Sequence, residues 1–332
     1  MPRPRSPRSG SAARARRPRR EPPLGGPSGA RRAGEETGTP PEIRPPPEQS
    51  AGSTRPSAAE IAFATAVLAP WRWLTAPKFY GLENVPTDRP VLLAGNHTIM
   101  GLLDAPLMVL GIHEHRGVFI RSLGDHAHFR IPGWRELLRT FGTVEGTREN
   151  CAALMRAGES IMVFPGGGRE VFKRKGEKYQ LLWERRLGFA RLAIEHGYPI
   201  VPFAAVGAEE CYDILLDAGD VLGTPVGALL ARLVPRADEL PPLVRGFGPT
   251  ALPRPERFYF RFGAPVETRR FAGTHRDDAA CMLVREQVRA AVEGGITFLL
   301  RERARDPDRR VLTRVLHQLG DLVRGKRTPH SS

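Results

Sequence analysis

Short apolar runs alternate with longer amphipathic stretches from about residue 58 onward. The runs have the length of buried strands, and the longer stretches repeat apolar residues at helical spacing. We predict strands at Val91–Ala94, Gly117–Arg121, Thr140–Val144, Ser160–Phe164, Ile200–Val206 and Phe258–Phe262. We predict helices at Leu102–Ile112, Arg148–Ala157, Tyr179–His196, Asp277–Arg303 and Val311–Val323. This alternation indicates an α/β fold with a largely parallel central sheet flanked by helices.

The N-terminal segment has a different composition. Residues 1–57 are rich in Pro, Arg, Gly and Ser and contain almost no large apolar side chain, which predicts a disordered basic arm. The capping-box pattern Ser57-Ala-Ala-Glu60 marks the start of the folded part. We therefore expect one α/β domain over residues 58–305, followed by a C-terminal amphipathic helix and tail over residues 306–332.

Two amphipathic stretches lie in the second half of the chain, at residues 227–244 and 311–323. The later one carries an apolar stripe edged with arginines, which suits either an anionic bilayer surface or packing onto the domain. Near the start of the domain, Trp71, Trp73 and Tyr80 stand beside basic residues. These aromatics fit a membrane interface and core packing equally well.

Charge narrows the choice of partners. The 332 residues carry a formal net charge of +14, and about half of this excess lies in the N-terminal arm. A basic surface favours an anionic partner such as nucleic acid, anionic lipid or coenzyme A. Basic motifs interleaved with aromatics, typical of RNA-binding modules, are missing, so we predict no nucleic-acid partner.

The cysteines and the hydropathy of the chain bear on its location. Cys151, Cys211 and Cys281 are far apart, which predicts reduced thiols in a cytosolic compartment. The N-terminus has no apolar segment like that of a secretory signal. The chain has no run of about 18 apolar residues, so we predict no spanning helix. We expect any membrane contact to be peripheral, at the cytoplasmic face.

The first motif with chemical potential is Gly95-Asn96-His97-Thr98-Ile99-Met100-Gly101-Leu102-Leu103-Asp104. It follows a predicted buried strand, and α/β sheets place their reactive groups at the carboxyl ends of strands. His97 has a side-chain type suited to removing a proton from a hydroxyl group. Asp104, one short loop later, is a candidate to orient the imidazole and stabilise its charged form.

The second motif, Phe164-Pro-Gly-Gly-Gly-Arg-Glu170, directly follows another predicted strand. The backbone amides of Gly166, Gly167 and Gly168 are free of side chains and can approach a phosphate or an oxyanion. Arg169 adds a planar charged group that binds phosphate or carboxylate.

Together these blocks resemble the glycerolipid acyltransferase superfamily, which includes lysophosphatidate acyltransferases. That family carries Asn-His-x-x-x-x-Asp, Gly-x-Ile-x-x-x-Arg, Phe-Pro-Glu-Gly-Thr-Arg and Val-Pro in this order. Here Asn96-His97 matches the first block and Gly142 to Arg148 the second, while the third and fourth match at Phe164 to Arg169 and Val201-Pro202. The resemblance implies His97 as the general base and Asn96, Arg148, Arg169 and Glu170 as substrate-binding candidates with the three glycines.

The sequence departs from this pattern at two places. The usual spacing puts the aspartate at position 102, where this chain has Leu102, and Asp104 follows two residues later. Gly166 replaces the family's glutamate, and Glu170 follows Arg169. This second departure resembles the branch related to transmembrane protein 68 and the type 2 diacylglycerol acyltransferases. It favours a mono- or diacylglycerol or a long-chain alcohol as acceptor over lysophosphatidate.

The resemblance implies direct acyl transfer from acyl-CoA to a lipid hydroxyl at a membrane surface, with neither a cofactor nor a metal. The donor oxyanion would be held by the backbone of Gly166–Gly168 or by Arg169. The basic stretch Arg169 to Lys178 fits either coenzyme A phosphates or a solvated loop.

Other classes fit less well. A serine hydrolase would need Gly-x-Ser-x-Gly, which is absent from the sequence. His113, His115, His126 and His128 match no zinc-binding spacing. A non-catalytic binding protein for membrane or nucleic acid and an acyltransferase inactivated by the shifted aspartate remain as alternatives.

Overall fold

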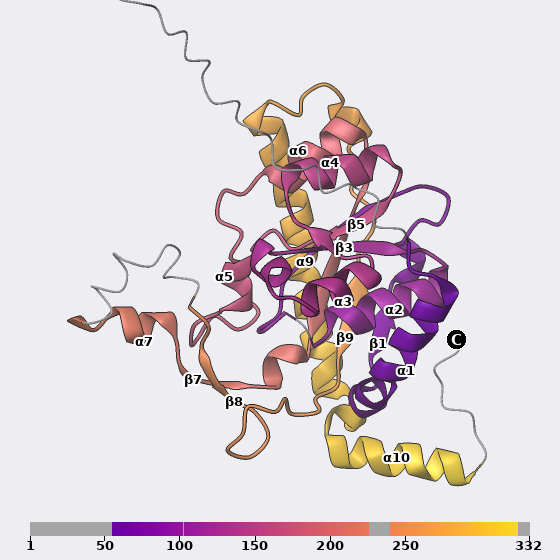
Figure 1. The fold of residues 1–332 in the computed structure, drawn as a ribbon, viewed down its shortest axis with the longest axis vertical. Coiled ribbons are helices and arrows are strands. Elements are labelled where there is room, and N and C mark those ends of the chain that lie inside the picture. Colours follow the sequence, from indigo (N-terminus) through magenta and orange to yellow (C-terminus); the bar gives the residue numbers. More distant parts are fainter. Residues whose placement is uncertain (1–54, 102, 226–239, 325–332) are drawn as a thin grey trace, which may run out of the picture. The chain divides into compact units, whose positions relative to one another are not determined.

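The computed structural model describes residues 55–101, 103–225 and 240–324. Seven strands form the central sheet in the order β1-β9-β6-β2-β5-β3-β4. They are β1 Lys78–Tyr80, β2 Leu92–Gly95, β3 Ile120–Gly124, β4 Val144–Glu145, β5 Ser160–Val163, β6 Ile200–Val206 and β9 Tyr259–Phe262. Figure 1 shows β3 and β5 among the surrounding helices. Neighbouring strands pair in parallel except β6 and β9, which are antiparallel. The predicted α/β class with a largely parallel sheet is confirmed.

Helices cover both faces of this sheet. The α-helices are α1 Ala58–Thr75, α2 Ala105–Arg116, α3 Trp134–Thr140, α4 Arg148–Arg156, α5 Gly168–Val171, α6 Gly188–His196, α7 Ala218–Leu222, α9 Asp278–Arg305 and α10 Val311–Val323. A separate antiparallel pair is formed by β7 Asp213–Leu216 and β8 Leu243–Arg245. Side chains alternate across β2, so Leu92 packs with α4, α6 and α9 while Leu93 packs with α2 on the other face.

Most predicted elements form within a few residues of their expected bounds, and three needed correction. The predicted helix Tyr179–His196 begins only at Gly188, because Tyr179 and Glu184 have φ of 60° and 46°, which no α-helix accommodates. The predicted strand Thr140–Val144 was wrong in its first part, because Thr140 ends α3 and Gly142 turns the chain with φ 74°. The helix predicted from Leu102 starts at Ala105.

The start of the domain follows its sequence signal. Ser57 and Glu60 form the predicted capping box at the N-terminus of α1. Trp71 donates its indole N–H to the carbonyl oxygen of Leu103 at 3.0 Å and meets Phe258 edge-on, so this aromatic belongs to the core. The arm predicted at residues 1–57 and the amphipathic stretch 227–244 lie largely outside the described residues.

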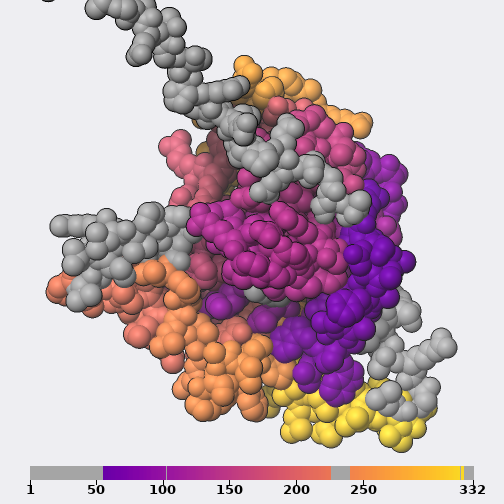
Figure 2. All heavy atoms as spheres, in the orientation of Figure 1, coloured from indigo at the N-terminus to yellow at the C-terminus, as the bar shows by residue number. Residues whose placement is uncertain are grey.

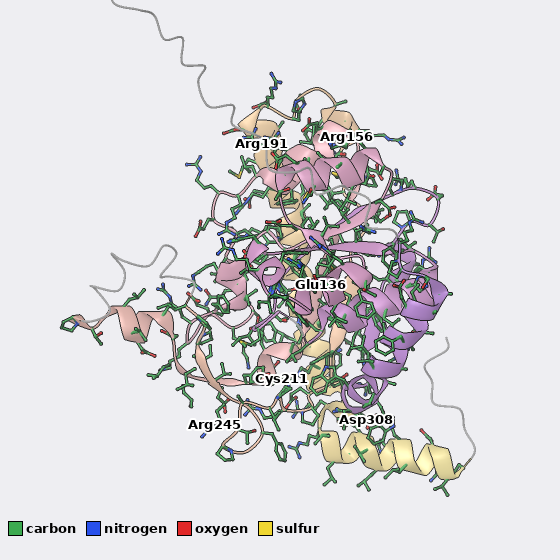
Figure 3. All side chains as sticks on the ribbon, in the orientation of Figure 1. Glu136, Arg156, Arg191, Cys211, Arg245 and Asp308 are labelled. Carbon is green, nitrogen blue, oxygen red and sulfur yellow. The ribbon has the colours of Figure 1, made fainter. Side chains whose placement is uncertain are left out.

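Two further sequence predictions concern the cysteines and the membrane. All three cysteines are buried as free thiols, and Cys211 is labelled among the packed side chains in Figure 3. Within residues 55–101, 103–225 and 240–324, no helix combines the length and apolar character needed to cross a bilayer.

Candidate active site

His97 lies two residues beyond the carboxyl end of β2, at the centre of the sheet. Its backbone N–H donates to Oε2 of Glu170 at 2.8 Å. Its ring is stacked on Phe164, with 3.8 Å between centroids and 14° between planes. Gly101, with φ 61°, lies against the imidazole so closely that a Cβ there would be 2.5 Å from Cε1 of His97. The imidazole is therefore fixed by contacts from both sequence motifs.

The partly buried His97 is uncharged in the folded protein. The pKa of its imidazole is lowered from 6.5 to about 3, mainly by burial and to a smaller extent by the neighbouring Lys173 and His128. Nδ1 is buried and has no hydrogen-bond partner among the described residues. A neutral imidazole has a lone pair with which to accept a proton, which general-base chemistry requires.

Asp104, the predicted orienting carboxylate, is the N-cap residue of α2 and is buried. Its Oδ1 accepts a hydrogen bond from the hydroxyl of Thr98 at 2.9 Å, and the described contacts include none between Asp104 and His97. Burial raises the pKa of Asp104 to about 6, although the bond from Thr98 opposes the rise. The two residues come from one loop, but the hydrogen bond that a relay needs is not formed in this structure.

The glycine motif forms a tight turn between β5 and α5. The N–H of Gly167 donates to the carbonyl oxygen of Phe164 at 2.9 Å, and Gly167 has φ 53°. Arg186 donates through Nη1 to the carbonyl oxygens of Gly166 at 2.7 Å and Pro165 at 3.3 Å. Sequence reasoning missed Arg186, because this residue precedes α6 in an irregular segment that was predicted as helix.

Glu170 joins the two motifs. Its side chain is fully buried, and its two carboxyl oxygens accept one backbone N–H each, from His97 at 2.8 Å and from Leu182 at 2.9 Å. The sequence predicted substrate binding for Glu170. In the structure both oxygens are engaged by the protein's own backbone, which supports a positioning role instead.

Asn96 is likewise engaged by the backbone. Its amide donates to the carbonyl oxygen of Ala205 at 2.9 Å and accepts from the N–H of Ala205 at 2.8 Å. These bonds continue the β2–β6 pairing beyond the last residue of β2. Asn96 was predicted to bind substrate, but its side chain fixes the strand end that carries His97.

The two arginines predicted to bind the acceptor lie in different surroundings. Arg169 forms an ion pair with Glu177 and has little exposed side chain. Arg148 begins α4, is largely exposed, and lies 3.6 Å from Glu195 of α6. No contact of Arg148 with His97 or with the glycine turn is found among the described residues, so the structure does not bring Arg148 into the site.

The basic stretch after Arg169 is not a solvated loop throughout. Lys173 is buried and forms an ion pair with Glu209, whose other carboxyl oxygen accepts the backbone N–H of Tyr179 at 2.6 Å. Lys175 and Lys178 are more exposed. Lys175 pairs with Asp220 at 2.8 Å, and Lys178 pairs with Glu210 at 3.4 Å. The solvated-loop interpretation was therefore wrong for Lys173.

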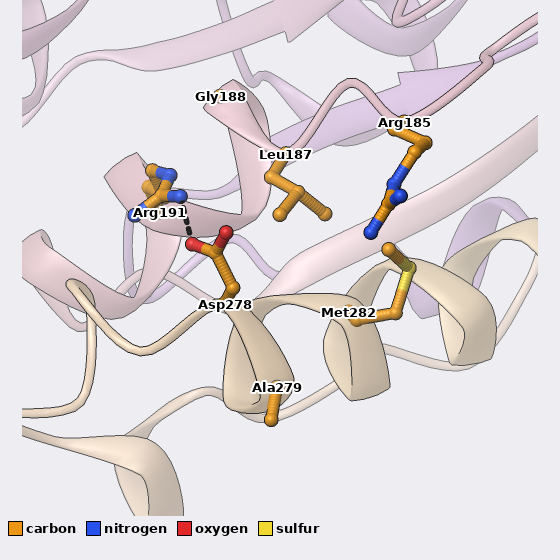
Figure 4. A pocket seen from close by; sticks show the side chains of 7 residues that line it. All are labelled: Arg185, Leu187, Gly188, Arg191, Asp278, Ala279 and Met282. Carbon is orange, nitrogen blue, oxygen red and sulfur yellow. Dashed lines mark hydrogen bonds and ion pairs between the residues drawn. The ribbon is translucent and has the colours of Figure 1, made fainter. Parts of the chain in front are cut away.

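A surface hollow of about 600 Å³ lies between the N-terminal ends of α6 and α9 (Figure 4). Arg191 and Asp278 form an ion pair on its wall, and Arg185 and Met282 face each other across it. It contains none of the residues of the two sequence motifs.

Residues 76–206 match the family model described as Acyltransferase. By this match residues 76–206 resemble an acyltransferase domain. The matched residues include His97 and the motif from Phe164 to Arg169, so the resemblance inferred from the sequence is confirmed.

Two curated relatives illustrate the match. The chain is 30% identical over 256 residues to phytyl ester synthase 1, chloroplastic, of Arabidopsis thaliana, covering 72% of this chain and 36% of that protein. It is 36% identical over 123 residues to the DGAT1/2-independent enzyme synthesizing storage lipids of Homo sapiens, covering 37% of each. The chain therefore spans little more than a third of the length of these relatives.

Among solved structures, the chain matches the 1-acyl-sn-glycerophosphate (LPA) acyltransferase of Thermotoga maritima. The TM-score is 0.45 and the sequence identity 18%, covering 71% of this chain and 78% of that one.

Proposed function

We propose that this protein is a membrane-associated O-acyltransferase that moves a fatty acyl group from acyl-CoA to the hydroxyl of a neutral lipid. The observation that carries the proposal is the neutral imidazole of His97 at the carboxyl end of β2, held against the Phe164 turn. This geometry supports a general base beside a glycine-rich turn, and the acyltransferase family match supports the reaction class.

In the proposed reaction His97 accepts the proton of the acceptor hydroxyl as its oxygen attacks the thioester carbonyl carbon. The tetrahedral oxyanion then collapses, the carbon–sulfur bond breaks, and the imidazolium returns the proton to the leaving thiolate. Backbone N–H groups of Gly166 and Gly168 stabilise the oxyanion, since that of Gly167 already donates to Phe164. We assign this role to the turn rather than to Arg169, because the guanidinium of Arg169 is already paired with Glu177.

The acceptor we favour is a mono- or diacylglycerol or a long-chain alcohol. A phosphate-bearing acceptor calls for a free cation beside His97, whereas Arg169 is paired with Glu177 and Arg148 lies on the surface beside Glu195. The names of the relatives, a phytyl ester synthase and an enzyme synthesizing storage lipids, point to the same acceptor class. Lysophosphatidate is the alternative acceptor, and exposed Arg148 is the residue in its favour.

The membrane part of the proposal rests on α10. This helix is attached to the domain by polar groups: Arg314 donates to the carbonyl oxygens of Leu74 at 2.9 Å and Pro255 at 2.6 Å, and Gln318 donates to that of Trp73 at 3.2 Å. Figure 2 shows α10 at the surface beside α1. Its most exposed apolar side chains are Leu312 (69%), Leu316 (59%), Leu319 (47%) and Val323 (89%).

These four residues are spaced by three or four positions and form one row along the helix. Arg310 and Arg324 stand exposed at its two ends. An apolar row between cations suits the interface of an anionic bilayer, where apolar side chains enter the acyl region and arginines meet the headgroups.

The test of the proposed function is ester formation by purified protein supplied with radiolabelled oleoyl-CoA. Diacylglycerol, monoacylglycerol, hexadecanol and lysophosphatidate are offered separately in mixed micelles, and products are resolved by thin-layer chromatography. We expect labelled ester with at least one of the three neutral acceptors. Ester with lysophosphatidate alone would overturn the acceptor class, and no ester with any of the four from folded protein would overturn the function.

A further inference from the structure

The carboxylate of Glu170 connects two segments that are distant along the chain. It accepts from His97, which follows β2, and from Leu182, in the irregular segment that precedes α6. The carboxylate is entirely shielded from solvent and lies beside the buried ion pair of Lys173 and Glu209. A buried carboxylate is costly unless its oxygens are hydrogen-bonded, and here each oxygen has a backbone partner.

Gly166 provides the space for this carboxylate. A Cβ at position 166 would lie 2.2 Å from both Cγ and Cδ of Glu170. The backbone of Gly166 does not have a positive φ, so this contact, and not backbone strain, excludes a side chain there. Positions 166 and 170 therefore compete for one volume, and only one of them can hold a side chain in it.

This competition explains the departure from the family's third block. The family pattern has a glutamate at the position of Gly166, whereas this chain has glycine there and a carboxylate from position 170 in the adjoining space. In this chain the acidic group therefore reaches that space from Glu170 in the first turn of α5, and position 166 carries no side chain.

We infer that Glu170 is a positioning residue for His97: its carboxylate, in the space left by Gly166, fixes the backbone at His97 and thereby holds the imidazole against Phe164. The inference rests on the proposed function only for its effect on turnover. Because it acts through backbone hydrogen bonds and touches no substrate, removal of the carboxylate lowers kcat and leaves the KM for acyl-CoA nearly unchanged.

The first variants are Glu170→Gln and Glu170→Ala. A glutamine has one oxygen to accept a backbone N–H, and its NH₂ group cannot accept the second, so Glu170→Gln leaves one of the two amides unpaired. We expect kcat to fall about 10-fold in Glu170→Gln and about 100-fold in Glu170→Ala, since small displacements of a catalytic group have effects of this size.

Asp306→Asn is the matched control. Asp306 is another buried carboxylate, which accepts from the hydroxyl of Tyr259 at 2.8 Å and pairs with Lys78 at 2.9 Å, outside the His97 site. Its substitution lowers thermal stability as loss of a buried ion pair does, with kcat per folded molecule kept within about twofold.

A rescue variant separates position from charge. In Gly166→Asp/Glu170→Ala the aspartate carboxyl carbon is one bond beyond a Cβ that itself lies 2.2 Å from the former Cδ, so the carboxylate returns to nearly the same place. Gly166→Asn/Glu170→Ala has the same shape without the charge. We expect at least 10-fold recovery of kcat over Glu170→Ala with aspartate and clearly less with asparagine.

Hydrogen exchange gives a readout that does not depend on activity. Residue-resolved exchange at the amides of His97 and Leu182 is expected to accelerate at least 10-fold in Glu170→Gln and to stay unchanged in Asp306→Asn. Unchanged exchange at both amides would overturn the inference even for a protein that shows no transfer. If wild-type protein transfers acyl groups through His97 while Glu170→Gln retains kcat within twofold, the inference fails and the proposed function stands.

Discussion

The imidazole of His97 lies stacked on the ring of Phe164, at 3.8 Å between centroids and 14° between planes. Phe164 in turn meets Phe203 of β6 edge-on at 5.6 Å. The glycine turn that follows Phe164 is held by Arg186, so the plane of the imidazole is set by a residue anchored in the second motif. The two sequence motifs thus form one site in which the aromatic face orients the imidazole.

This contact predicts the effect of Phe164→Leu. Leucine keeps most of the apolar volume but loses the flat surface, whose stacking is worth about 0.5–1.5 kcal/mol. We expect kcat to fall about 10-fold with a melting temperature within a few degrees of wild type, measured by steady-state kinetics and circular dichroism. Phe164→Tyr, which keeps the ring, is the control and is expected to retain most activity. Equal activity in Phe164→Leu and wild type would contradict the orienting role.

The lowered pKa of His97 predicts the pH dependence of the reaction. The pKa of His97 is lowered from 6.5 to about 3, with burial as the largest cause. The imidazole is therefore neutral throughout the ordinary assay range of pH. Between pH 5 and 9 we expect kcat/KM to show no decrease toward low pH with an apparent pKa near 6.5. An acid limb near pH 6.5 that is attributable to His97 would contradict the burial described for the free protein.

Asp104 predicts a change of stability with pH. Burial raises the folded-state pKa to about 6, above the ordinary 3.8, so the folded protein binds the proton more tightly than the unfolded chain. The ionised group therefore destabilises the fold as pH rises from about 4 to 6. We expect Asp104→Asn to stabilise the protein at pH 7.5 by on the order of 2–3 kcal/mol in urea unfolding, and to give little change at pH 4.

The same variant tests the relay prediction. If Asp104 leaves Thr98 and orients His97 during turnover, Asp104→Asn lowers kcat by about 1,000-fold or more while stability rises. Activity near the wild-type value in this variant would remove Asp104 from the mechanism. Thr98→Val, which deletes only the hydroxyl bond to Asp104, is the companion variant and keeps the carboxylate available to His97.

The exposed row on α10 predicts binding to anionic vesicles. The double variant Leu312→Ser/Leu316→Ser removes two apolar side chains that lie free of the domain, each worth roughly 1.5 kcal/mol or more when buried in lipid. We expect at least 100-fold weaker sedimentation with phosphatidylglycerol vesicles and an unchanged melting temperature. Leu283→Ser, another exposed leucine, on α9 (58%), is the control and is expected to bind normally. Equal vesicle binding by all three proteins would contradict the proposed contact.

The elements predicted best were those whose signals are local. The bounds of β6 and α10 came out as predicted, because a seven-residue apolar run and a regular helical stripe need no tertiary information. His97 was placed correctly at a strand end for the same reason. The segment from Tyr179 to Leu187 was predicted as helix but is irregular, with positive φ at Tyr179 and Glu184. The sequence does not show tertiary contacts such as the hydrogen bond from the Tyr179 N–H to Glu209.

The site contacts were harder to predict than the site residues. The glycine at 166 and the glutamate at 170 were visible as a departure from the family pattern, but their competition for one volume appears only in three dimensions. Arg186 reaches the glycine turn from a segment 20 residues away, and no spacing rule links the two. Asn and Glu side chains commonly bind ligands in proteins. The sequence alone therefore did not reveal that backbone amides already engage Asn96 and Glu170.

The proposed role of His97 as the base for acyl transfer is tested most directly by release of free coenzyme A from oleoyl-CoA in the presence of the best acceptor. Wild-type protein is compared with His97→Ala, each shown to be folded by circular dichroism and by its melting temperature. We expect acceptor-dependent release by wild type and a loss of at least 1,000-fold in His97→Ala. Folded His97→Ala protein that releases coenzyme A at near wild-type rate would contradict it.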